Sequence, residues 1–432
     1  MNRPPRGRPR RALSMPSAPG RIGNDGERDL ARELAGALAD AGHGRGRDVA
    51  DSVTHPVHTY PARMHPATAR RLVEVVAGPT RAGALLVDPF CGSGTTLVEA
   101  RFFGVRALGL DLSPLAVLIA RAKTWTVSPT RRRALRETAH HLAGEALAAG
   151  KQARRSGQGP TTERRPVGFD PNARNRRLSG WFAPHVRREL EDLAARIDEV
   201  RSRDAELADV LTVGLSAILI KVSNRASDTD PTKMPRTIAR GNVARLFARR
   251  IDLLCAGLDD LGARRGPQPE VVQSDARKLG DLVPAGGVAG IVTSPPYAGT
   301  YDYAEQQRLR FDFLGLHHRE FHDGEIGARR GFAGGGARDA VARWRSDLAA
   351  VIDAMATALA PGGRAALVIG DSIAAGRAMW ADDDVRASLD DRLALVAWAW
   401  QERPALGATE KRVFQDRGKR EHILLLERSR GA

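Results

Sequence analysis

A short apolar run followed by a glycine-rich turn constrains the fold of this chain more than any other feature of its sequence. Residues 84–88 read Ala-Leu-Leu-Val-Asp, residues 89–96 read Pro-Phe-Cys-Gly-Ser-Gly-Thr-Thr, and the pattern becomes helical over 97–104. A second apolar run, residues 105–111, follows and also ends in an acid. Continuous apolar runs are typical of parallel strands that are buried on both faces. Two such strands joined by a helix predict an α/β fold.

The glycine-rich turn is a candidate cofactor-binding loop, because strand, turn and helix form the nucleotide-binding unit of Rossmann-like folds. A phosphate-binding P-loop needs a lysine after the second glycine, where Thr95 stands. A dinucleotide fingerprint needs a third small residue, where Leu97 stands. The remaining possibility is a loop whose backbone lies close to a cofactor that has no pyrophosphate.

Acidic residues follow three of the predicted strands. Asp88 ends the first and could bind a positively charged amine. Asp111 lies about twenty residues beyond the turn, where a carboxylate meets ribose hydroxyls in Rossmann-like folds. As an alternative, Asp111 could cap the next helix, a role that Ser113 can also serve. Asp275 follows a further apolar run, residues 270–273.

Residues 293–297 read Thr-Ser-Pro-Pro-Tyr and end another predicted strand, residues 288–292. Each proline lacks an N–H group and fixes φ, so the strand cannot continue, and the residue before each proline is extended. We expect a rigid elbow in which Ser294 and neighbouring carbonyl groups point outwards beside the ring of Tyr297. Such acceptors suit a flat ring that carries an amino group. The alternative is a structural turn with Tyr297 packed in the core.

The charge of the chain indicates an anionic partner. Its 432 residues include 67 Lys and Arg against 51 Asp and Glu, for a net charge of +16, and nucleic acid is the usual partner of such a protein. The basic residues are nearly all arginine, which can also reflect genomic base composition. Two cysteines, Cys91 and Cys255, exclude a disulfide framework and a cysteine-based zinc site. The irregular spacing of His55, His58 and His65 predicts no metal site.

The length suits two domains or one enlarged α/β domain. Residues 1–48 are rich in Arg, Pro and Gly and predict a disordered basic N-terminal arm. The two halves of an α/β core are expected over 49–123 and 268–432. Residues 124–267 carry helical patterns and predict a helical insertion. Residues 298–340 interleave aromatic residues with arginine and can contact nucleic acid, or they form an ordinary helix and loop.

No secretory signal is found at the N-terminus, which lacks an apolar core segment. The longest uncharged apolar stretch, Val210–Ile220, is too short to span a bilayer. The sequence therefore predicts a cytoplasmic protein without a membrane partner.

Three motifs together resemble a known family. Residues 88–96 resemble the cofactor motif of the S-adenosylmethionine-dependent DNA amino-methyltransferases, and residues 293–297 resemble their [Asp/Asn/Ser]-Pro-Pro-[Tyr/Phe] catalytic motif. Residues 60–66, Tyr-Pro-Ala-Arg-Met-His-Pro, resemble the segment that lies beside the cofactor in many of these enzymes. The resemblance covers residues 55–123 and roughly 268–432.

The resemblance implies a Rossmann-like seven-stranded methyltransferase sheet and S-adenosylmethionine as cofactor, whereas the helical insertion predicted for residues 124–267 lies outside the resemblance. The last two strands of such a sheet form an antiparallel pair, and the apolar runs 393–400 and 422–427, with a basic turn between them, fit that pair. The implied cofactor-binding residues are Tyr60, Asp88, Pro89, Phe90, Cys91, Gly92, Gly94, Thr95, Asp111 and Asp275. The implied catalytic residues are Ser294, Pro295, Pro296 and Tyr297.

In this family the glycine-rich loop would hold the methionine end of the cofactor. Asp111 would bind the ribose hydroxyls and Asp275 the adenine amine. Ser294 and the Pro295 carbonyl would accept hydrogen bonds from the exocyclic amine of a flipped base, and Tyr297 would stack on that base.

The resemblance further implies a site-specific methyltransferase of double-stranded DNA in a restriction-modification or defence system, with a possible cognate endonuclease. Serine at the first motif position favours cytosine N4 over adenine N6. Cytosine C5 is disfavoured, because that reaction needs a nucleophilic cysteine, typically after proline, and Cys91 follows Phe90. An RNA (tRNA) base methyltransferase and a catalytically silent nucleic-acid-binding protein are the alternatives. Target recognition could lie in 124–267 or in 298–340. The sequence does not define an oligomeric state.

Overall fold

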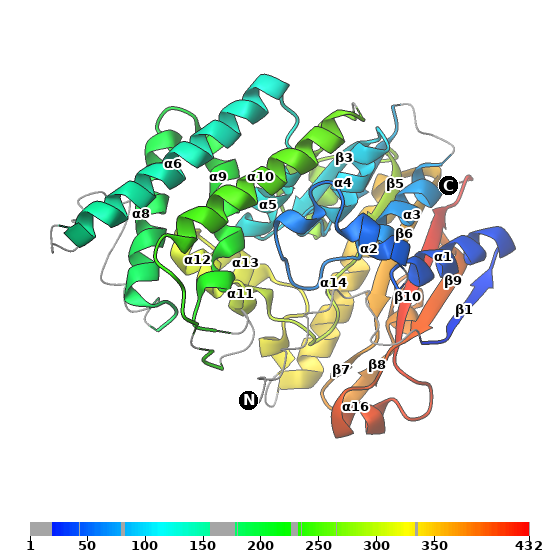
Figure 1. The fold of residues 1–432 in the computed structure, drawn as a ribbon. Coiled ribbons are helices and arrows are strands. Elements are labelled where there is room, and N and C mark those ends of the chain that lie inside the picture. Colours follow the sequence, from blue (N-terminus) through cyan, green and yellow to red (C-terminus); the bar gives the residue numbers. More distant parts are fainter. Residues whose placement is uncertain are drawn as a thin grey trace.

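An eight-stranded sheet forms the centre of the molecule, and helices cover both of its faces (Figure 1). The computed structural model describes residues 20–42, 44–78, 83–155, 178, 180–225, 232–234, 236–264, 266–332 and 336–431. The strands of the sheet are β1 (Ile22–Gly26), β2 (Leu85–Asp88), β3 (Arg106–Asp111), β4 (Glu270–Gln273), β5 (Val288–Thr293), β6 (Leu359–Gly370), β9 (Leu393–Glu402) and β10 (Arg420–Arg428). A separate hairpin consists of β7 (Ser372–Ala374) and β8 (Arg377–Met379).

The strands follow the order β1-β9-β10-β6-β5-β2-β3-β4. From β4 to β6 neighbouring strands run parallel, whereas β10 is antiparallel to both β6 and β9. The predicted Rossmann-like α/β fold is confirmed, and so is the antiparallel pair near the C-terminus. The carboxyl ends of β2, β3, β4 and β5 lie at one edge of the sheet, which brings the residues that follow these strands together.

The predicted strand count of seven is wrong, because β1 adds an eighth strand at the edge. β1 pairs antiparallel with β9, from Ile22 opposite Gln401 to Gly26 opposite Ala397. The helix that follows it, residues 28–40, buries apolar side chains, namely Ala31, Leu34, Ala37 and Leu38. The predicted disorder of residues 1–48 is therefore also wrong for the described part of that segment. Its alanine- and glycine-rich composition masked the apolar spacing of a packed helix. Residues 1–19 lie outside the described residues.

Helices surround this sheet and extend to one side of it (Figure 1). They are α1 (Arg28–Asp40), α2 (Gly44–Ala50), α3 (Pro66–Ala77), α4 (Thr95–Phe102), α5 (Pro114–Lys123), α6 (Pro129–Arg155), α8 (Pro184–Arg201), α9 (Ala205–Ile218), α10 (Asn242–Gly262), α11 (Tyr303–Gln306), α12 (Arg308–Leu314), α13 (Arg319–Gly324), α14 (Ala337–Ala358), α15 (Ala381–Arg386) and α16 (Gly407–Val413). Short 3-10 helices span His55–Val57, Ile220–Val222, Ala276–Asp281 and Arg329–Phe332. Residues of α1, α3 and α4 pack on one face of the sheet, and those of α14 pack on the other.

Between β3 and β4 the described chain is helical. The helices α6, α8, α9 and α10 enclose an apolar cluster of their own, which also includes residues of α5 and α12. Phe311 and Phe313 of α12 are each 1% exposed. These two rings of the 298–340 segment are therefore core residues and are not free to stack on bases. Among the described helices, none is both long enough and apolar enough to cross a membrane.

Candidate functional site

A pocket opens at the carboxyl edge of the sheet, where β2, β3, β4 and β5 end. Of the residues predicted from the sequence, those that line it are Tyr60, Asp88, Pro89, Phe90, Cys91, Gly92, Thr95, Asp111, Asp275, Ser294 and Pro296. Three predicted residues do not line it, namely Gly94, Pro295 and Tyr297. The fold thus brings the glycine-rich loop and the proline elbow into one cavity, although they are far apart in the sequence.

The two glycines of the loop, Gly92 and Gly94, have different roles in its packing. Both have positive φ, +51° at Gly92 and +77° at Gly94, which side chains other than glycine rarely adopt. A Cβ atom at Gly94 would lie 2.9 Å from the Cβ atom of Ala120 on α5. Gly94 therefore lets the loop pack against α5. Gly92 faces the pocket, where a Cβ atom would lie 3.7 Å from the ring of Tyr60.

Asp88 is a buried acid at the end of β2, with 3% exposure. Its Oδ1 accepts hydrogen bonds from the Thr293 hydroxyl at 2.7 Å and from the Phe90 N–H at 3.1 Å. Burial raises the pKa of Asp88 to about 6. A cation in the pocket would stabilise the ionised form, so the site favours a positively charged ligand group at this point.

Asp111 holds the loop and the next turn together. One carboxylate oxygen accepts the Gly92 N–H at 2.9 Å, and the other accepts the Ser113 N–H at 2.8 Å. Burial raises the pKa of Asp111 to about 6. Each carboxylate oxygen can accept a second hydrogen bond. Ser113 caps α5 through the Ala116 N–H, so capping does not require Asp111, whose carboxylate lines the pocket.

Asp275 lines the pocket but already has a strong partner. The Nε atom of Arg277 lies 3.0 and 3.1 Å from its two carboxylate oxygens, and Arg277 also pairs with Asp347 at 2.5 Å. Burial would raise the pKa of Asp275, but the hydrogen bonds from Arg277 outweigh it and the pKa is lowered. The carboxylate is therefore ionised and fixed in orientation.

The proline elbow orients Ser294 towards the pocket. The Ser294 hydroxyl donates a 2.9 Å hydrogen bond to the carbonyl of Val368 on β6. With its proton directed there, the oxygen can still accept a hydrogen bond from a ligand. The Pro296 carbonyl accepts a 3.0 Å hydrogen bond from Trp344 Nε1, and Pro295 is buried.

Tyr297 lies in the core and does not line the pocket. Its ring is 7% exposed and covers Gly370, where a Cβ atom would lie 2.7 Å from the ring. Its hydroxyl donates a 3.4 Å hydrogen bond to Glu421. Of the two possibilities that the sequence left open for Tyr297, this structure shows the packed ring.

Several pocket residues were not predicted from the sequence. Arg63 is the one cation among the described lining residues, and Glu325 and Tyr303 approach from the segment after the elbow. The Glu325 carboxylate accepts the Tyr303 N–H at 2.6 Å and pairs with Arg330 at 2.7 Å. Arg63 stands in the quoted 60–66 motif and could have been found there. The loop that holds Glu325 has no sequence pattern that places it at the pocket.

The three histidines near the N-terminus have separate partners. His55 Nε2 lies 2.6 Å from Glu99, His58 Nε2 lies 3.0 Å from Ser216, and His65 accepts the Ala67 N–H. Burial lowers the pKa of all three. These contacts are typical of buried neutral imidazoles, and they hold the three rings on separate partners and not around one metal ion.

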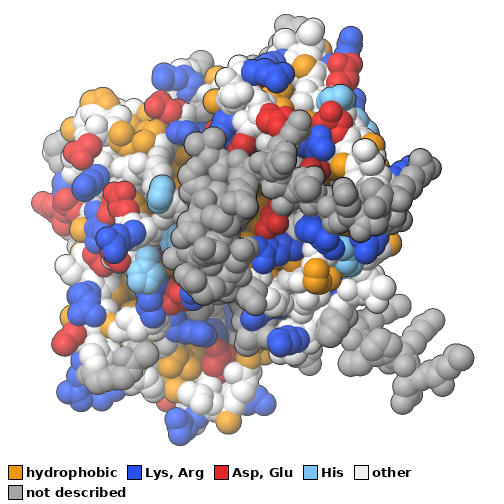
Figure 2. All heavy atoms as spheres, turned by 90° about the vertical axis from the view of Figure 1, so that its left-hand side faces the viewer, with side chains coloured by type: hydrophobic (Ala, Val, Ile, Leu, Met, Phe, Trp, Pro, Cys, Tyr) orange, Lys and Arg blue, Asp and Glu red, His pale blue; other side chains and the backbone are white. Residues whose placement is uncertain are grey.

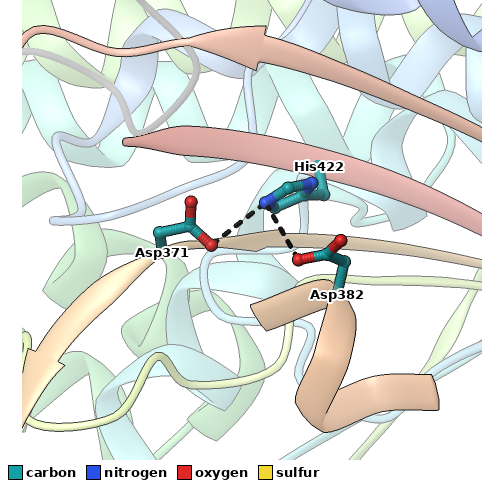
Figure 3. A group of neighbouring side chains, drawn as sticks. All are labelled: Asp371, Asp382 and His422. Carbon is teal, nitrogen blue, oxygen red and sulfur yellow. Dashed lines mark hydrogen bonds and ion pairs between the residues drawn. The ribbon is translucent and has the colours of Figure 1, made fainter. Parts of the chain in front are cut away.

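A second cluster, Asp371, Asp382 and His422, has the residue types of a metal site (Figure 3). His422 Nε2 lies 3.1 Å from Asp371 and 3.7 Å from Asp382. However, Trp398 Nε1 donates a 3.1 Å hydrogen bond to His422 Nδ1. Nδ1 must then carry the lone pair and Nε2 the proton. The imidazole therefore donates to Asp371, and Nε2 has no lone pair for a metal.

A family model and several known proteins each match a short part of the chain. A family model described as an RMKL-like methyltransferase domain matches residues 55–135. The type II methyltransferase M.MvaI of Kocuria varians is 38% identical over 79 residues, which are 18% of this chain and 17% of that protein. The type II methyltransferase M.MjaII of Methanocaldococcus jannaschii is 39% identical over 70 residues, 16% of this chain and 12% of that protein.

These matches support a resemblance to S-adenosylmethionine-dependent DNA methyltransferases over the short part of the chain that they cover. The resemblance seen in the sequence is thus confirmed for the region of the cofactor motif, and S-adenosylmethionine is the methyl donor of that family. A tRNA (guanine(10)-N2)-dimethyltransferase of Methanothermobacter thermautotrophicus is also 43% identical over 53 residues, 12% of this chain and 15% of that protein. The chain spans less than a fifth of the length of each of these relatives.

Proposed function

We propose that this protein transfers a methyl group from S-adenosylmethionine to an exocyclic amine of a flipped base in double-stranded DNA, with cytosine N4 as the preferred atom. The observation that carries the proposal is the shared pocket, in which Ser294 and the glycine-rich loop line one cavity. Transfer requires the methyl donor and the accepting amine to lie side by side, and a single cavity allows that.

The charges of the pocket fit the cofactor. S-adenosylmethionine carries an ammonium group, a sulfonium group and one carboxylate. The described lining residues include four acids and one arginine, Arg63. We assign Arg63 to the carboxylate and Asp88 to the ammonium group, whose charge compensates the cost of ionising this buried acid. Asp111 would bind the ribose hydroxyls, and Asp275 would bind the adenine amine.

Ser294 has the central role in the proposed reaction. An exocyclic amine is a poor nucleophile, because its lone pair is delocalised into the ring. Ser294, fixed by its bond to Val368, would accept a hydrogen bond from one N–H group. The Pro295 carbonyl, which does not line the pocket in this structure, would accept one from the other N–H group once the bound base reaches it, and the two bonds together would favour a pyramidal nitrogen. The bound cofactor supplies an electrophilic methyl group. No protein nucleophile is needed, so the rate would come from positioning and electrostatics.

Extraction of the base from the duplex costs a few kcal/mol. Stacking on an aromatic ring would return part of this energy. Tyr297 can be the stacking partner only if its ring moves away from Gly370 or if the base reaches the edge of the Tyr297 ring. Tyr303 already lines the pocket and is a second candidate for the stacking partner.

The choice of DNA follows the two type II methyltransferases among the relatives, and the choice of cytosine follows the serine of the catalytic motif. A restriction-modification role, with a cognate endonuclease in the cytoplasm, is part of the same proposal. Adenine N6 is the alternative atom. The tRNA-modifying relative makes an RNA base the second candidate substrate.

The experiment incubates the purified chain with labelled S-adenosylmethionine and either unmethylated genomic DNA or tRNA. We expect label in duplex DNA and a loss of about 100-fold in rate for Ser294→Ala, the size seen when one preorganised hydrogen-bonding group is removed from an active site. Cofactor affinity should be unchanged in this variant. If label appeared in tRNA alone, the substrate would be RNA and not DNA. Full activity of Ser294→Ala would contradict the assigned mechanism.

A further inference from the structure

The connection between β9 and β10 is strongly basic and lies at the carboxyl edge of the sheet, and the proposed function does not use it. We call residues 403–420 the basic arm. It contains six basic and two acidic residues and includes the short helix α16. Figure 1 shows α16 and the β7–β8 hairpin projecting together beyond the sheet. Because β9 ends and β10 begins at the edge where the pocket lies, the basic arm is on the same side as the pocket.

The basic arm is firmly packed at its base. The rings of Trp380 and Phe414 meet edge to face, with centroids 5.4 Å apart. The guanidinium of Arg417 lies 4.8 Å from the Trp380 ring and pairs with Asp382 and, at 2.8 Å, with Asp383. These contacts attach the arm to α15, so it can present its outer side chains in a fixed place.

The first residue of the arm is linked to the proline elbow at residues 293–297. Arg403 pairs with the buried carboxylate of Glu421, which accepts the 3.4 Å hydrogen bond from Tyr297. Only one acidic side chain therefore separates the root of the arm from the elbow. A duplex whose base enters the pocket would extend past this point.

Two cations of the arm are free to bind an external anion. Lys411 and Arg412 on α16 are exposed, and neither has an ion pair with a described residue. Arg377 at the tip of the β7–β8 hairpin is exposed in the same way. The helical insertion differs, because many of its arginines are paired, as in Arg131 with Asp204 and Arg196 with Glu145. On the side of the molecule where α6 and α8 lie, Figure 2 shows basic and acidic side chains interspersed.

We propose that the basic arm, through Lys411 and Arg412, binds the phosphate backbone of the DNA duplex beside the flipped nucleotide. This inference rests on the proposed function, because it takes the duplex as the substrate. Lysine and arginine contacts to phosphates position a duplex without reading its sequence. The arm would therefore act with either candidate recognition segment, on the other side of the target base.

The test compares Lys411→Ala/Arg412→Ala with a matched control, Arg106→Ala/Arg430→Ala. The control removes two exposed arginines at the opposite edge of the sheet, where β3 begins and β10 has ended. The affinity of each variant for a fluorescent 30-base-pair duplex is measured between 50 and 300 mM salt. Each phosphate contact contributes about 0.9 to the slope of log affinity against log salt. We expect the arm variant to lose about 2 from this slope and the control to lose none.

Two further measurements separate this inference from the proposed function. The melting temperature and the affinity for S-adenosylhomocysteine should be the same in both variants and in the wild type. A wild-type protein that methylates duplex DNA while the arm variant keeps the full slope would overturn the inference alone. Equal losses of slope in the arm variant and the control variant would overturn it as well. A wild-type protein that binds duplex DNA but never methylates it would instead contradict the proposed function.

Discussion

The hydroxyl of Thr293 donates a 2.7 Å hydrogen bond to Asp88, although 205 positions separate the two residues in the sequence. Thr293 is the last residue of β5 and Asp88 the last residue of β2, and these strands are neighbours in the sheet. The bond therefore fixes the proline elbow beside the glycine-rich loop. It also helps to keep a buried carboxylate hydrogen-bonded, which matters because an unpaired polar group in the interior is costly.

Removal of this bond should destabilise the protein. Thr293→Val keeps the shape of the side chain but takes a donor from a buried carboxylate, and we expect the free energy of unfolding to fall by about 1.5–3 kcal/mol. Urea denaturation measures the change. Thr126→Val is the control, because its exposed hydroxyl donates only to the Thr124 carbonyl at 3.3 Å. Equal losses in the two variants would show that the Asp88 contact has no special weight.

Cofactor affinity should depend on pH through Asp88 and Asp111. Burial raises the pKa of both carboxyls to about 6, so both take up protons as the pH falls through 6. Only the ionised forms attract the cofactor ammonium group and accept hydrogen bonds fully. Calorimetric affinity for S-adenosylhomocysteine should fall below pH 6, by up to about tenfold per pH unit for each group.

Asp88→Asn tests which acid causes this dependence. The amide oxygen can still accept from Thr293, but the charge is gone, so we expect weaker binding and a shallower pH dependence. Without cofactor the same raised pKa values favour the protonated folded state. Their contribution to stability is thus present at low pH and is lost as the pH rises from about 4 through 6. An affinity that is constant between pH 5 and 8 in the wild type would contradict this account.

Arg63 should recognise the carboxylate of the cofactor. Arg63→Met keeps most of the apolar stem and removes the charge, and a hydrogen bond to a charged group contributes about 1.5–3 kcal/mol. Affinity for S-adenosylhomocysteine should therefore fall by about 10–100-fold. Affinity for methylthioadenosine, which has no carboxylate, should stay the same. A parallel loss for both ligands would assign Arg63 a structural role only, through its 2.7 Å bond to the His55 carbonyl.

Gly94 should tolerate no side chain. Its φ of +77° costs about 1–2 kcal/mol for another residue, and a Cβ atom would also meet Ala120 at 2.9 Å. Gly104 is the matched control, because its φ is +74° and a Cβ atom there has no neighbour within 4 Å. We expect Gly104→Ala to lower the free energy of unfolding by the backbone cost alone. Gly94→Ala should lower it by more, and equal losses would show that the loop can move away from α5.

The sequence predicted those parts of the site that sit at strand ends. Asp88, Asp111, Asp275 and Ser294 each follow an apolar run, and the carboxyl ends of parallel strands meet at one edge whatever the intervening chain does. The pocket could therefore be assembled from local patterns alone. The antiparallel pair was likewise predicted from local patterns, namely two apolar runs with a basic turn between them.

The remaining parts of the site depend on tertiary contacts that no local pattern encodes. Glu325 reaches the pocket because its carboxylate binds the Tyr303 N–H. The position of the Tyr297 ring depends on the space above Gly370. The two prolines that precede Tyr297 determine only the course of the backbone. β1 was missed because residues 22–26 are polar and glycine-rich, and an edge strand needs only one neighbour to pair with.

The most direct test of the central claim is the identity of the methylated nucleoside. Duplex DNA is incubated with the protein and isotopically labelled S-adenosylmethionine, digested to nucleosides and analysed by mass spectrometry. We expect labelled N4-methylcytosine, formed about 100-fold more slowly by Ser294→Ala. Labelled 5-methylcytosine, or no labelled nucleoside in DNA when tRNA is labelled, would contradict it.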